Sequence, residues 1–239
     1  LIATQNLLSA CEHYGPRSHK FIFVSSQAAG GPSRRHKALS EEEAHHPISS
    51  YGRSKLRAEA AVLKFSQKRP ATIIRPPSVY GPSDVDFLKL FKMINHRIIP
   101  MPGRGDQRIS IVYITDLIEG IFSAALSPKA DGEIFFICND EPVTFFEIGN
   151  IVAGVLNKKT LTLPLPLSLI TAASQAAVML SKFTRKAPLL NRDKVLEIRQ
   201  EAWICSNAKA KRLLNYSART DIVEGMRQTA QWYKNNGRL

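Results

Sequence analysis

The chain has 239 residues, of which 44% are hydrophobic and 22% are charged, and these proportions are ordinary for a globular protein. Its length suits one large domain or a domain with an attached lobe. The formal charge is +13, but the basic residues are dispersed and no aromatic platform lies among them, so a solvated basic face is favoured over a nucleic-acid site. We therefore expect no nucleic-acid partner. An anionic cofactor or substrate is a milder explanation of the charge.

The cysteines and histidines indicate neither a disulfide framework nor a metal site. Cys11, Cys138 and Cys205 lie far apart, with no Cys-x-x-Cys, which predicts reduced thiols in a cytoplasmic protein. The three histidines of the polar loop 27–48 fit no standard metal spacing, and we expect them to be solvated. Residues 1–10 lack the basic segment and long apolar run of a signal peptide.

Apolar patterning and turn residues predict alternating helices and strands. Residues 20–24 form a short continuous apolar run, typical of a strand buried on both faces of a parallel sheet. Residues 72–75 are a second such strand, which Pro76-Pro77 ends, and 78–82 is a turn-rich segment. Asp116 and Thr144 are predicted helix N-caps. Helices are expected over 1–14, 50–67, 85–95, 116–126, 144–156, 191–199 and 221–234, and one more helix is expected to end at 214. Further strands are expected over 98–101, 108–114, 134–138 and 202–205.

The segment 161–183 is proline-rich at first and then apolar as far as Leu180. Its length raises the question of a membrane span, but the prolines and interspersed polar residues favour a buried or lid helix instead. Peripheral membrane contact through its apolar face and the basic residues Lys182, Arg185 and Lys186 stays open as an alternative.

Tyr51 and Lys55 lie four residues apart at the start of the helix 50–67, so their side chains share one face. A phenol has an unperturbed pKa of about 10, and a nearby cation lowers that pKa by favouring the phenolate. Such a tyrosine suits proton transfer near neutral pH. Tyr-x-x-x-Lys also occurs by chance on many helices, so its weight comes from the flanking motifs.

Those motifs are a strand ending in Ser25-Ser26 and a strand followed by Pro-Pro-Ser-Val-Tyr-Gly-Pro. With Tyr-x-x-x-Lys between them, the arrangement resembles the extended short-chain dehydrogenase/reductase superfamily, the NAD-dependent epimerase/dehydratase group, over most of the chain. The resemblance implies an α/β fold: a partial Rossmann-like parallel sheet with flanking helices, plus a smaller C-terminal substrate lobe. It places 1–140 in the cofactor-binding domain, with substrate-lobe insertions near 83–110. Residues 141–239 would mainly form the substrate lobe and terminal helices.

The resemblance also implies roles for individual residues. Tyr51 would exchange a proton with a substrate hydroxyl or carbonyl. Lys55 would lower the pKa of this tyrosine and bind the nicotinamide ribose, and Ser26 would bind the reacting oxygen. Ser25 is the alternative candidate for the position of the catalytic serine. The implied cofactor-binding residues are Ser25, Tyr51, Lys55, Pro76, Pro77, Ser78 and Val79, and the implied substrate-binding residues are Ser26, Gln27, Ser78 and Arg108.

Two departures from the family refine this expectation. No G-x-x-G-x-x-G or G-x-G-x-x-G motif occurs, so we expect a C-terminal portion of a longer enzyme that alone neither binds NAD or NADP tightly nor turns over. Gln27-Ala28 stands where 4,6-dehydratases carry an acidic pair, which disfavours a dehydratase.

Three functions stay open. We favour a reductase of a hydroxyl/carbonyl pair that acts on a small molecule, because the apolar segment 161–180 suits a hydrophobic substrate. The alternatives are a nucleotide-sugar epimerase and a non-catalytic NAD(P)- or RNA-binding relative. Dimerisation through a four-helix bundle that includes the Tyr51 helix is common in the family, so a homodimer stays open by analogy.

Overall fold

The computed structural model describes residues 1–15, 19–184 and 192–239. Its central sheet is parallel and has the strand order β1-β2-β7. The three strands are β1 (Phe21–Val24), β2 (Ala71–Arg75) and β7 (Ile134–Phe136). All five residues of β2, the middle strand, are buried. The two strands expected at 20–24 and 72–75 are therefore neighbours in one parallel sheet.

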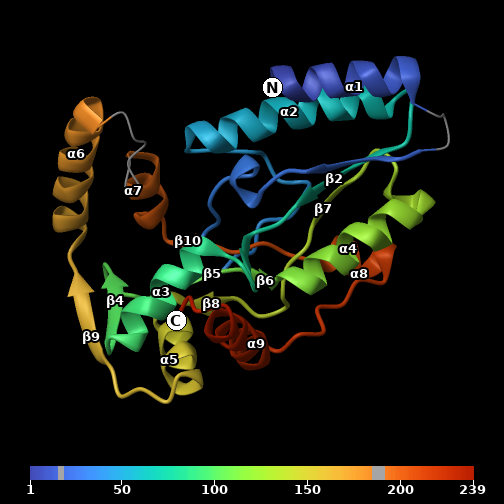
Figure 1. Ribbon diagram of the computed structural model, residues 1–239. Coiled ribbons are helices and arrows are strands. Elements are labelled where there is room, and N and C mark those ends of the chain that lie inside the picture. The colour runs from blue at the N-terminus through green and yellow to red at the C-terminus, as the bar shows by residue number, and fades with distance from the viewer. Residues whose placement is uncertain (16–18, 185–191) are drawn as a thin grey trace.

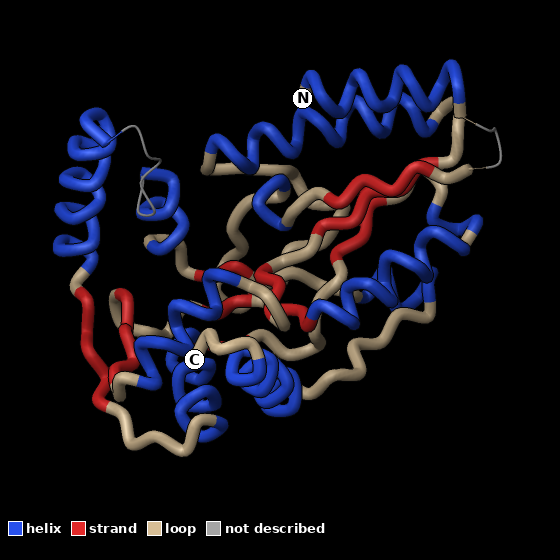
Figure 2. Tube along the Cα trace, viewed as in Figure 1, coloured by secondary structure: helices blue, strands red, loops and turns tan. Residues whose placement is uncertain are grey.

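Helices cover both faces of this sheet, as Figures 1 and 2 show. They are α1 (Ile2–Tyr14) and α2 (Ser50–Ser66) on one face, and α4 (Ile114–Leu126) and α8 (Ala208–Leu214) on the other. Successive strand side chains point to opposite faces, so Ile73 packs in the core under α1 and α2 and Ile74 in the core under α4 and α8. This layering is that of a Rossmann-like α/β fold.

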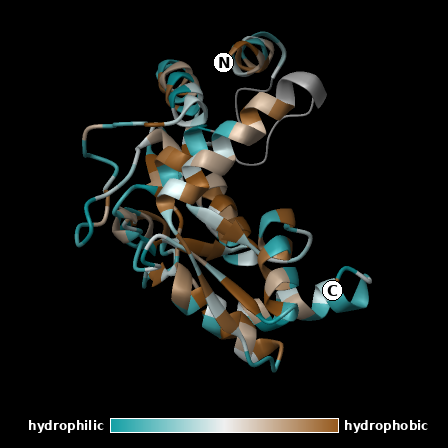
Figure 3. Ribbon diagram, turned by 90° about the vertical axis from the view of Figure 1, so that its left-hand side faces the viewer, coloured by the Kyte–Doolittle hydropathy of each residue, from teal (hydrophilic) through white to brown (hydrophobic). Residues whose placement is uncertain are grey.

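A third hydrophobic core, in addition to the two that lie on the faces of the sheet, holds together a lobe beside the central sheet. It contains Phe91, Ile148 and Tyr233, which are contributed by three helices. These helices are α3 (Val85–Asn95), α5 (Phe145–Val155) and α9 (Ile222–Asn235). Figure 3 shows hydrophobic residues gathered where helices face strands, and hydrophilic residues along the outlying loops. Ile114, the first residue of α4, also packs against this core, so α4 connects the lobe to the sheet.

Short strands complete the molecule. β3 (Ser78–Tyr80) pairs in parallel with β6 (Ile111–Tyr113), and β4 (Ile98–Pro102) pairs in parallel with β9 (Leu161–Leu165). A three-stranded sheet has the order β10-β5-β8, from β10 (Ala202–Trp203), β5 (Arg108–Ile109) and β8 (Val143–Thr144). Two further helices, α6 (Leu167–Thr184) and α7 (Arg192–Ile198), stand at one side of the molecule in Figure 1, and 3-10 turns occupy η1 (Gln27–Ala29) and η2 (Pro128–Ala130).

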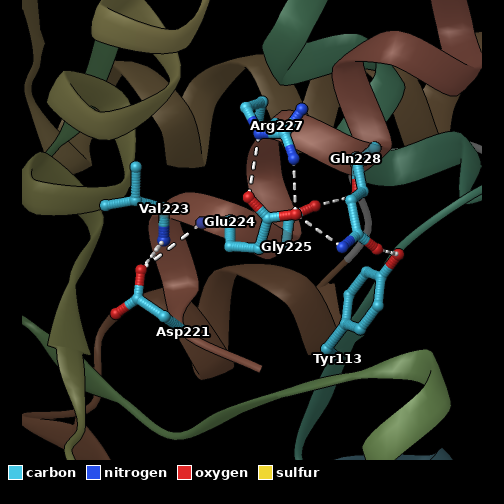
Figure 4. A network of polar contacts seen from close by, with 8 residues as sticks. Tyr113, Asp221, Val223, Glu224, Gly225, Arg227 and Gln228 are labelled. Atoms are coloured by element: carbon cyan, nitrogen blue, oxygen red, sulfur yellow. Dashed lines mark hydrogen bonds and ion pairs between the residues drawn. The ribbon is translucent and has the colours of Figure 1, made fainter. Parts of the chain in front are cut away.

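A polar network fixes the start of α9 against β6 (Figure 4). Asp221 caps the helix by accepting hydrogen bonds from two backbone N–H groups of the first turn. Glu224 pairs with Arg227 at 2.6 Å and accepts a hydrogen bond from Gln228 at 2.7 Å. The Gln228 amide oxygen in turn accepts from the Tyr113 hydroxyl at 2.9 Å. The network therefore anchors the terminal helix to the last residue of β6.

Several local predictions are confirmed. The helix expected at 85–95 has those bounds, and the helix expected at 50–67 ends one residue earlier. Thr144 is the N-cap of α5 and forms a capping box with Glu147. In each case, short-range signals in the sequence suffice, because caps and periodic apolar residues act within one or two turns.

Other predictions are wrong because a distant segment decides the local structure. The strand at 20–24 is not buried on both faces: Val24 is 42% exposed, since β1 pairs only with β2 among the described strands. Residues 78–80 form a strand rather than part of a turn-rich segment, because β6 supplies a partner for them. The strand expected at 108–114 breaks at Ser110, whose backbone N–H donates to Trp203 O. Asp116 is no N-cap; its carboxylate accepts from the backbone of Arg219 and Thr220.

The helix α6 is not buried. Leu169, Met179 and Leu180 are each more than half exposed, and Ser174 is the buried residue of 167–180. Among the described residues, none of the helices combines the length and the apolarity that crossing a bilayer requires. Arg185 and Lys186, two of the basic residues in the predicted alternative of peripheral membrane contact, lie outside the described residues, as does the side chain of Lys182.

Candidate functional site

A cleft of about 320 Å³ opens where the carboxyl ends of β1 and β2 meet the start of α2. Ser26 and Gln27 line it from the end of β1, Tyr51 from α2, and Pro77 and Ser78 from beyond β2. Open α/β sheets bind ligands at this end of their strands. The structure therefore brings five of the predicted site residues together.

The chain turns sharply after β1, and the turn separates the two serines. Ser25 continues the ladder through its backbone N–H, which donates to Ile74 O at 2.7 Å, and its buried hydroxyl has no hydrogen-bond partner. Ser26 caps the turn η1, and its Oγ accepts from the backbone N–H of Ala28 at 3.2 Å. Ser26 lines the cleft and Ser25 does not, which favours Ser26 for the catalytic role.

The start of α2 lies directly against this turn. Ser49 caps the helix by accepting from the backbone N–H of Gly52 at 3.1 Å. Gly52 is buried, and a Cβ added to it would lie 2.2 Å from Ala28 O. Only a glycine permits this approach. The close contact holds the 53% exposed side chain of Tyr51 in the same cleft as Ser26.

Lys55 lies one turn further along α2, beside Tyr51. Its Nζ is 5.7 Å from the centroid of the Tyr51 ring and 5.1 Å from that of Phe23. The ammonium donates to Val24 O at 2.9 Å, which orients it toward the end of β1. Burial lowers the pKa of Lys55, and the negative charge of Glu59 opposes that shift. The predicted common face of Tyr51 and Lys55 is therefore present in the structure.

Behind the cleft, a buried ion pair ties α2 to the end of β2. Arg75 and Glu59 are 0% and 1% exposed, and the guanidinium makes two hydrogen bonds to the carboxylate, at 2.9 and 2.6 Å. His45 lies 3.0 Å from the same guanidinium. Burial, and then the charge of Arg75, lower the pKa of His45. The expectation that all three loop histidines are solvated is therefore wrong for His45.

Besides Ser25 and Lys55, three further predicted site residues lie outside the lining of the cleft. Pro76 is buried, and its carbonyl accepts from the backbone N–H of Gln27 at 2.8 Å. Val79 packs in the core under α4. Arg108 donates to Pro142 O at 3.3 Å, while its neighbour Ile109 lines the cleft in its place. The functional roles of Pro76, Val79 and Arg108 stay predictions.

Sequence patterns did not identify the opposite wall of the cleft, which the lobe provides. Ile109, Phe145 and Trp203 contribute to it, together with residues of α7. At one end of α7, Asp193 Oδ2 accepts from the backbone N–H of Ser50 at 2.7 Å. The wall is thus fastened to the helix that carries Tyr51. A long-range contact of this kind leaves no local signal in the sequence.

Within the described parts of the chain, no group of three or more His, Cys, Asp or Glu residues is placed to hold a metal ion. The cleft presents the hydroxyl groups of Ser26 and Tyr51, with the Lys55 ammonium next to the Tyr51 ring.

Comparison with known proteins agrees with this geometry. The profile of the NAD-dependent epimerase/dehydratase family matches residues 1–138. The uncharacterized protein y4nL of Sinorhizobium fredii is 30% identical over 98% of this chain and 67% of its own length. Sterol-4-alpha-carboxylate 3-dehydrogenase, decarboxylating, of Saccharomyces cerevisiae is 27% identical over 96% of this chain and 69% of its own length.

Among solved structures, UDP-glucuronic acid 4-epimerase from Bacillus cereus in complex with NAD has a TM-score of 0.77 at 24% identity. The match covers 99% of this chain and 67% of that one, and it confirms the α/β, Rossmann-like fold. The chain spans about two thirds of the length of these relatives. With the family profile matching more than half of its residues, the chain belongs to the NAD-dependent epimerase/dehydratase family.

Proposed function

We propose that the protein containing this chain is an NAD(P)-dependent oxidoreductase that interconverts a hydroxyl and a carbonyl group. Ser26, Tyr51 and Lys55 would be its catalytic residues. The observation that carries this proposal is that Ser26 and Tyr51 line one cleft while the Lys55 ammonium lies 5.7 Å from the centre of the Tyr51 ring. Membership of an NAD-dependent family supports the same chemistry.

The residues at this end of the cleft fit the nicotinamide end of the cofactor. Lys55 and Tyr51 would hold the ribose, and Pro77 and Ser78 would lie along the nicotinamide. The buried Ser25 hydroxyl, which has no hydrogen-bond partner, is a polar group at the end of β1 that a bound cofactor can satisfy. When bound, the cofactor accepts or supplies the hydride of the reaction.

The chain's own residues handle the proton. The Tyr51 phenol would give a proton to a carbonyl oxygen or take one from a hydroxyl, with the Lys55 ammonium beside its ring. The Ser26 oxygen accepts from the N–H of Ala28, so its own O–H remains available to donate to the reacting oxygen. The bond from Lys55 to Val24 O keeps the ammonium in place throughout.

The proposal is tested by Tyr51→Phe in the full-length protein, with NAD(H) or NADP(H) consumption as the readout. Loss of the phenol proton should lower kcat by roughly 10²–10⁴-fold, the usual contribution of general acid–base catalysis. Tyr14→Phe is the matched control, because Tyr14 is 89% exposed on α1 and lies outside the cleft. A kcat for Tyr51→Phe within twofold of the unaltered protein would contradict the proposal.

A nucleotide-sugar epimerase is the second candidate, and the family name favours it. It would use the same three residues, but the cofactor would return to its starting oxidation state in every turnover. Net formation or loss of reduced cofactor therefore separates the two candidates, because an oxidoreductase changes its amount and an epimerase does not.

A further inference from the structure

We infer that the substrate is an uncharged alcohol or ketone with an apolar body and with a second oxygen close to the reacting carbon, rather than a nucleotide sugar. This inference rests on the proposed function and names the substrate class of the same cleft. It follows from which polar groups of the cleft are already engaged within the protein and which are left for a ligand.

Three polar groups of the lobe wall, from Gln107, Ser110 and Trp203, are engaged in hydrogen bonds within the protein. The Gln107 amide nitrogen donates to backbone carbonyls of the segment 197–200, the shortest bond being 2.6 Å to Gln200 O. The Trp203 indole N–H donates to Glu197 O at 3.0 Å. The Ser110 hydroxyl accepts from the backbone N–H of Cys205 at 3.0 Å and donates to Cys205 O at 3.5 Å. Each of these groups would have to give up a bond to the protein in order to bind a sugar or a base.

Charge in the cleft does not suit a diphosphate. The described lining contains one basic side chain, Lys194, and Glu197 lies 3.3 Å from its ammonium. Arg108, the predicted substrate-binding arginine, donates to Pro142 O outside the lining. Phosphate groups are bound in proteins by cations and bidentate arginine contacts. A carboxylate beside the lone lysine counteracts that attraction, so a neutral ligand fits better.

The remaining surface of the lobe wall is apolar. Ile109, Phe145, Ile198 and the ring of Trp203 face the cleft. A cavity of about 320 Å³ is at the lower end of the size range of small-molecule sites, which are lined mainly by hydrophobic and aromatic side chains. This wall therefore contacts the body of the substrate.

The unengaged polar groups gather at the opposite end, next to Tyr51. Gln27 lines the cleft, is 4% exposed, and its amide nitrogen has no hydrogen-bond partner. A buried amide N–H without an acceptor costs free energy that a bound acceptor recovers. Since Ser26 and Tyr51 bind the reacting oxygen, Gln27 is left for a second oxygen on a neighbouring carbon.

Equilibrium binding tests this inference without turnover of the two ketone probes, because a ketone cannot react when the bound cofactor is NAD⁺. Isothermal titration of the full-length protein with NAD⁺ would use methyl 3-oxooctanoate, 3-octanone and UDP-glucose as probes. We expect the oxoester to bind at least roughly tenfold more tightly than either of the others. UDP-glucose binding as tightly as the oxoester, or no binding of the oxoester, would overturn the inference.

Two pairs of variants test which residues of the cleft determine the affinity and the preference for the oxoester. Phe145→Ala should weaken oxoester binding by roughly tenfold, whereas Phe146→Ala, one residue further along α5 and outside the cleft, should leave it within about twofold. Gln27→Met should abolish the preference for the oxoester over 3-octanone, and Gln67→Met, exposed at the end of α2, should retain it. Unchanged affinity in Phe145→Ala, or an unchanged preference in Gln27→Met, would overturn the inference.

Turnover with the reduced cofactor separates this inference from the proposed function. Selective oxoester binding without cofactor oxidation would refute the proposed function and leave the substrate class standing. Cofactor oxidation with equal efficiency for methyl 3-oxooctanoate and 3-octanone would refute the substrate class alone.

Discussion

Gly52 allows the first turn of α2 to lie against the turn that carries Ser26. A methyl group at this position would meet Ala28 O at 2.2 Å, which no structure tolerates without a shift of the helix or the turn. We expect Gly52→Ala to lower kcat at least roughly tenfold, since small displacements of reacting groups are costly. Steady-state kinetics would measure the fall in kcat, and a thermal unfolding curve would show whether the fold is also destabilised.

Gly154→Ala is the control for this change, because a Cβ there meets nothing within 4 Å and the residue lies within α5. It should leave kcat unchanged and stabilise the fold by about 0.5–1 kcal/mol through helix propensity. Equal kcat values for the two variants would show that close contact between α2 and η1 does not position Tyr51.

The buried carboxyl of Glu41 gives the protein a specific pH dependence. Burial raises its pKa, and the backbone N–H of Phe136, which donates to Oε1 at 2.8 Å, opposes the shift. A raised pKa means that the native state binds the proton more tightly than the unfolded chain does. The stabilisation from this group is therefore complete below the unfolded pKa and is lost as the pH rises through the folded pKa.

Glu41→Gln retains an acceptor oxygen but cannot ionise. Its free energy of unfolding, relative to that of the unaltered protein, should therefore increase between about pH 4 and about pH 7. Urea denaturation at the two pH values measures this difference. Glu42→Gln, at an exposed neighbouring carboxyl, should show a smaller change. The same change in both variants would rule out burial of Glu41 as its cause.

At the scale of elements, the ion pair between Glu59 and Arg75 joins α2 to β2 beneath the cleft. Removing one partner leaves an unpaired charge in a site that is at most 1% exposed, so Glu59→Gln should lower the free energy of unfolding by about 3–5 kcal/mol. Denaturant unfolding would detect this loss. Asp86→Asn, at an exposed pair with Lys89, should have little effect. A mild effect of Glu59→Gln would mean that Arg75 finds another partner.

The elements that could be predicted from the sequence are those whose signals are local. The helix at 85–95 has an Asp84 cap and an apolar stripe, and α5 has its capping box. Strand β3 could not be predicted, because its hydrogen-bond partner is more than 30 residues away and Gly81-Pro82 follows it directly. The exposure of α6 was also unpredictable, since an apolar segment is ordinarily buried and only its packing shows otherwise.

The same distinction holds for the site. Ser26, Tyr51 and Lys55 follow from short motifs, and the structure brings them to one region because the ends of parallel strands share an edge. The lobe wall depends on contacts across much of the chain, such as that of Asp193 with the backbone of Ser50. Arg108 illustrates the limit: alternation along β5 decides which of two neighbours faces the cleft, and a shift of one residue reverses it.

At the scale of the whole molecule, burial is uneven. β2 has a strand on each side and helices over both faces, and all its residues are buried. α6 and β9 form an arm at one side of the molecule, where Leu161 is 72% exposed and Leu169 is 58% exposed (Figure 1). Local stability follows such differences in packing, because a segment with few buried contacts opens without disturbing the core.

Hydrogen–deuterium exchange should therefore separate the two regions. We expect amides of β2 at residues 71–75 to exchange more slowly than those of α6 at 167–180, since β2 can exchange only when the sheet opens, whereas α6 rests mainly on α7. β1 should be intermediate, because one of its edges carries no strand among the described residues. Mass spectrometry of peptic fragments resolves all three segments. If α6 proved as slow as β2, its apolar face would have to be covered in solution by another part of the protein or by a second molecule, and the exposed leucines would then mark that contact.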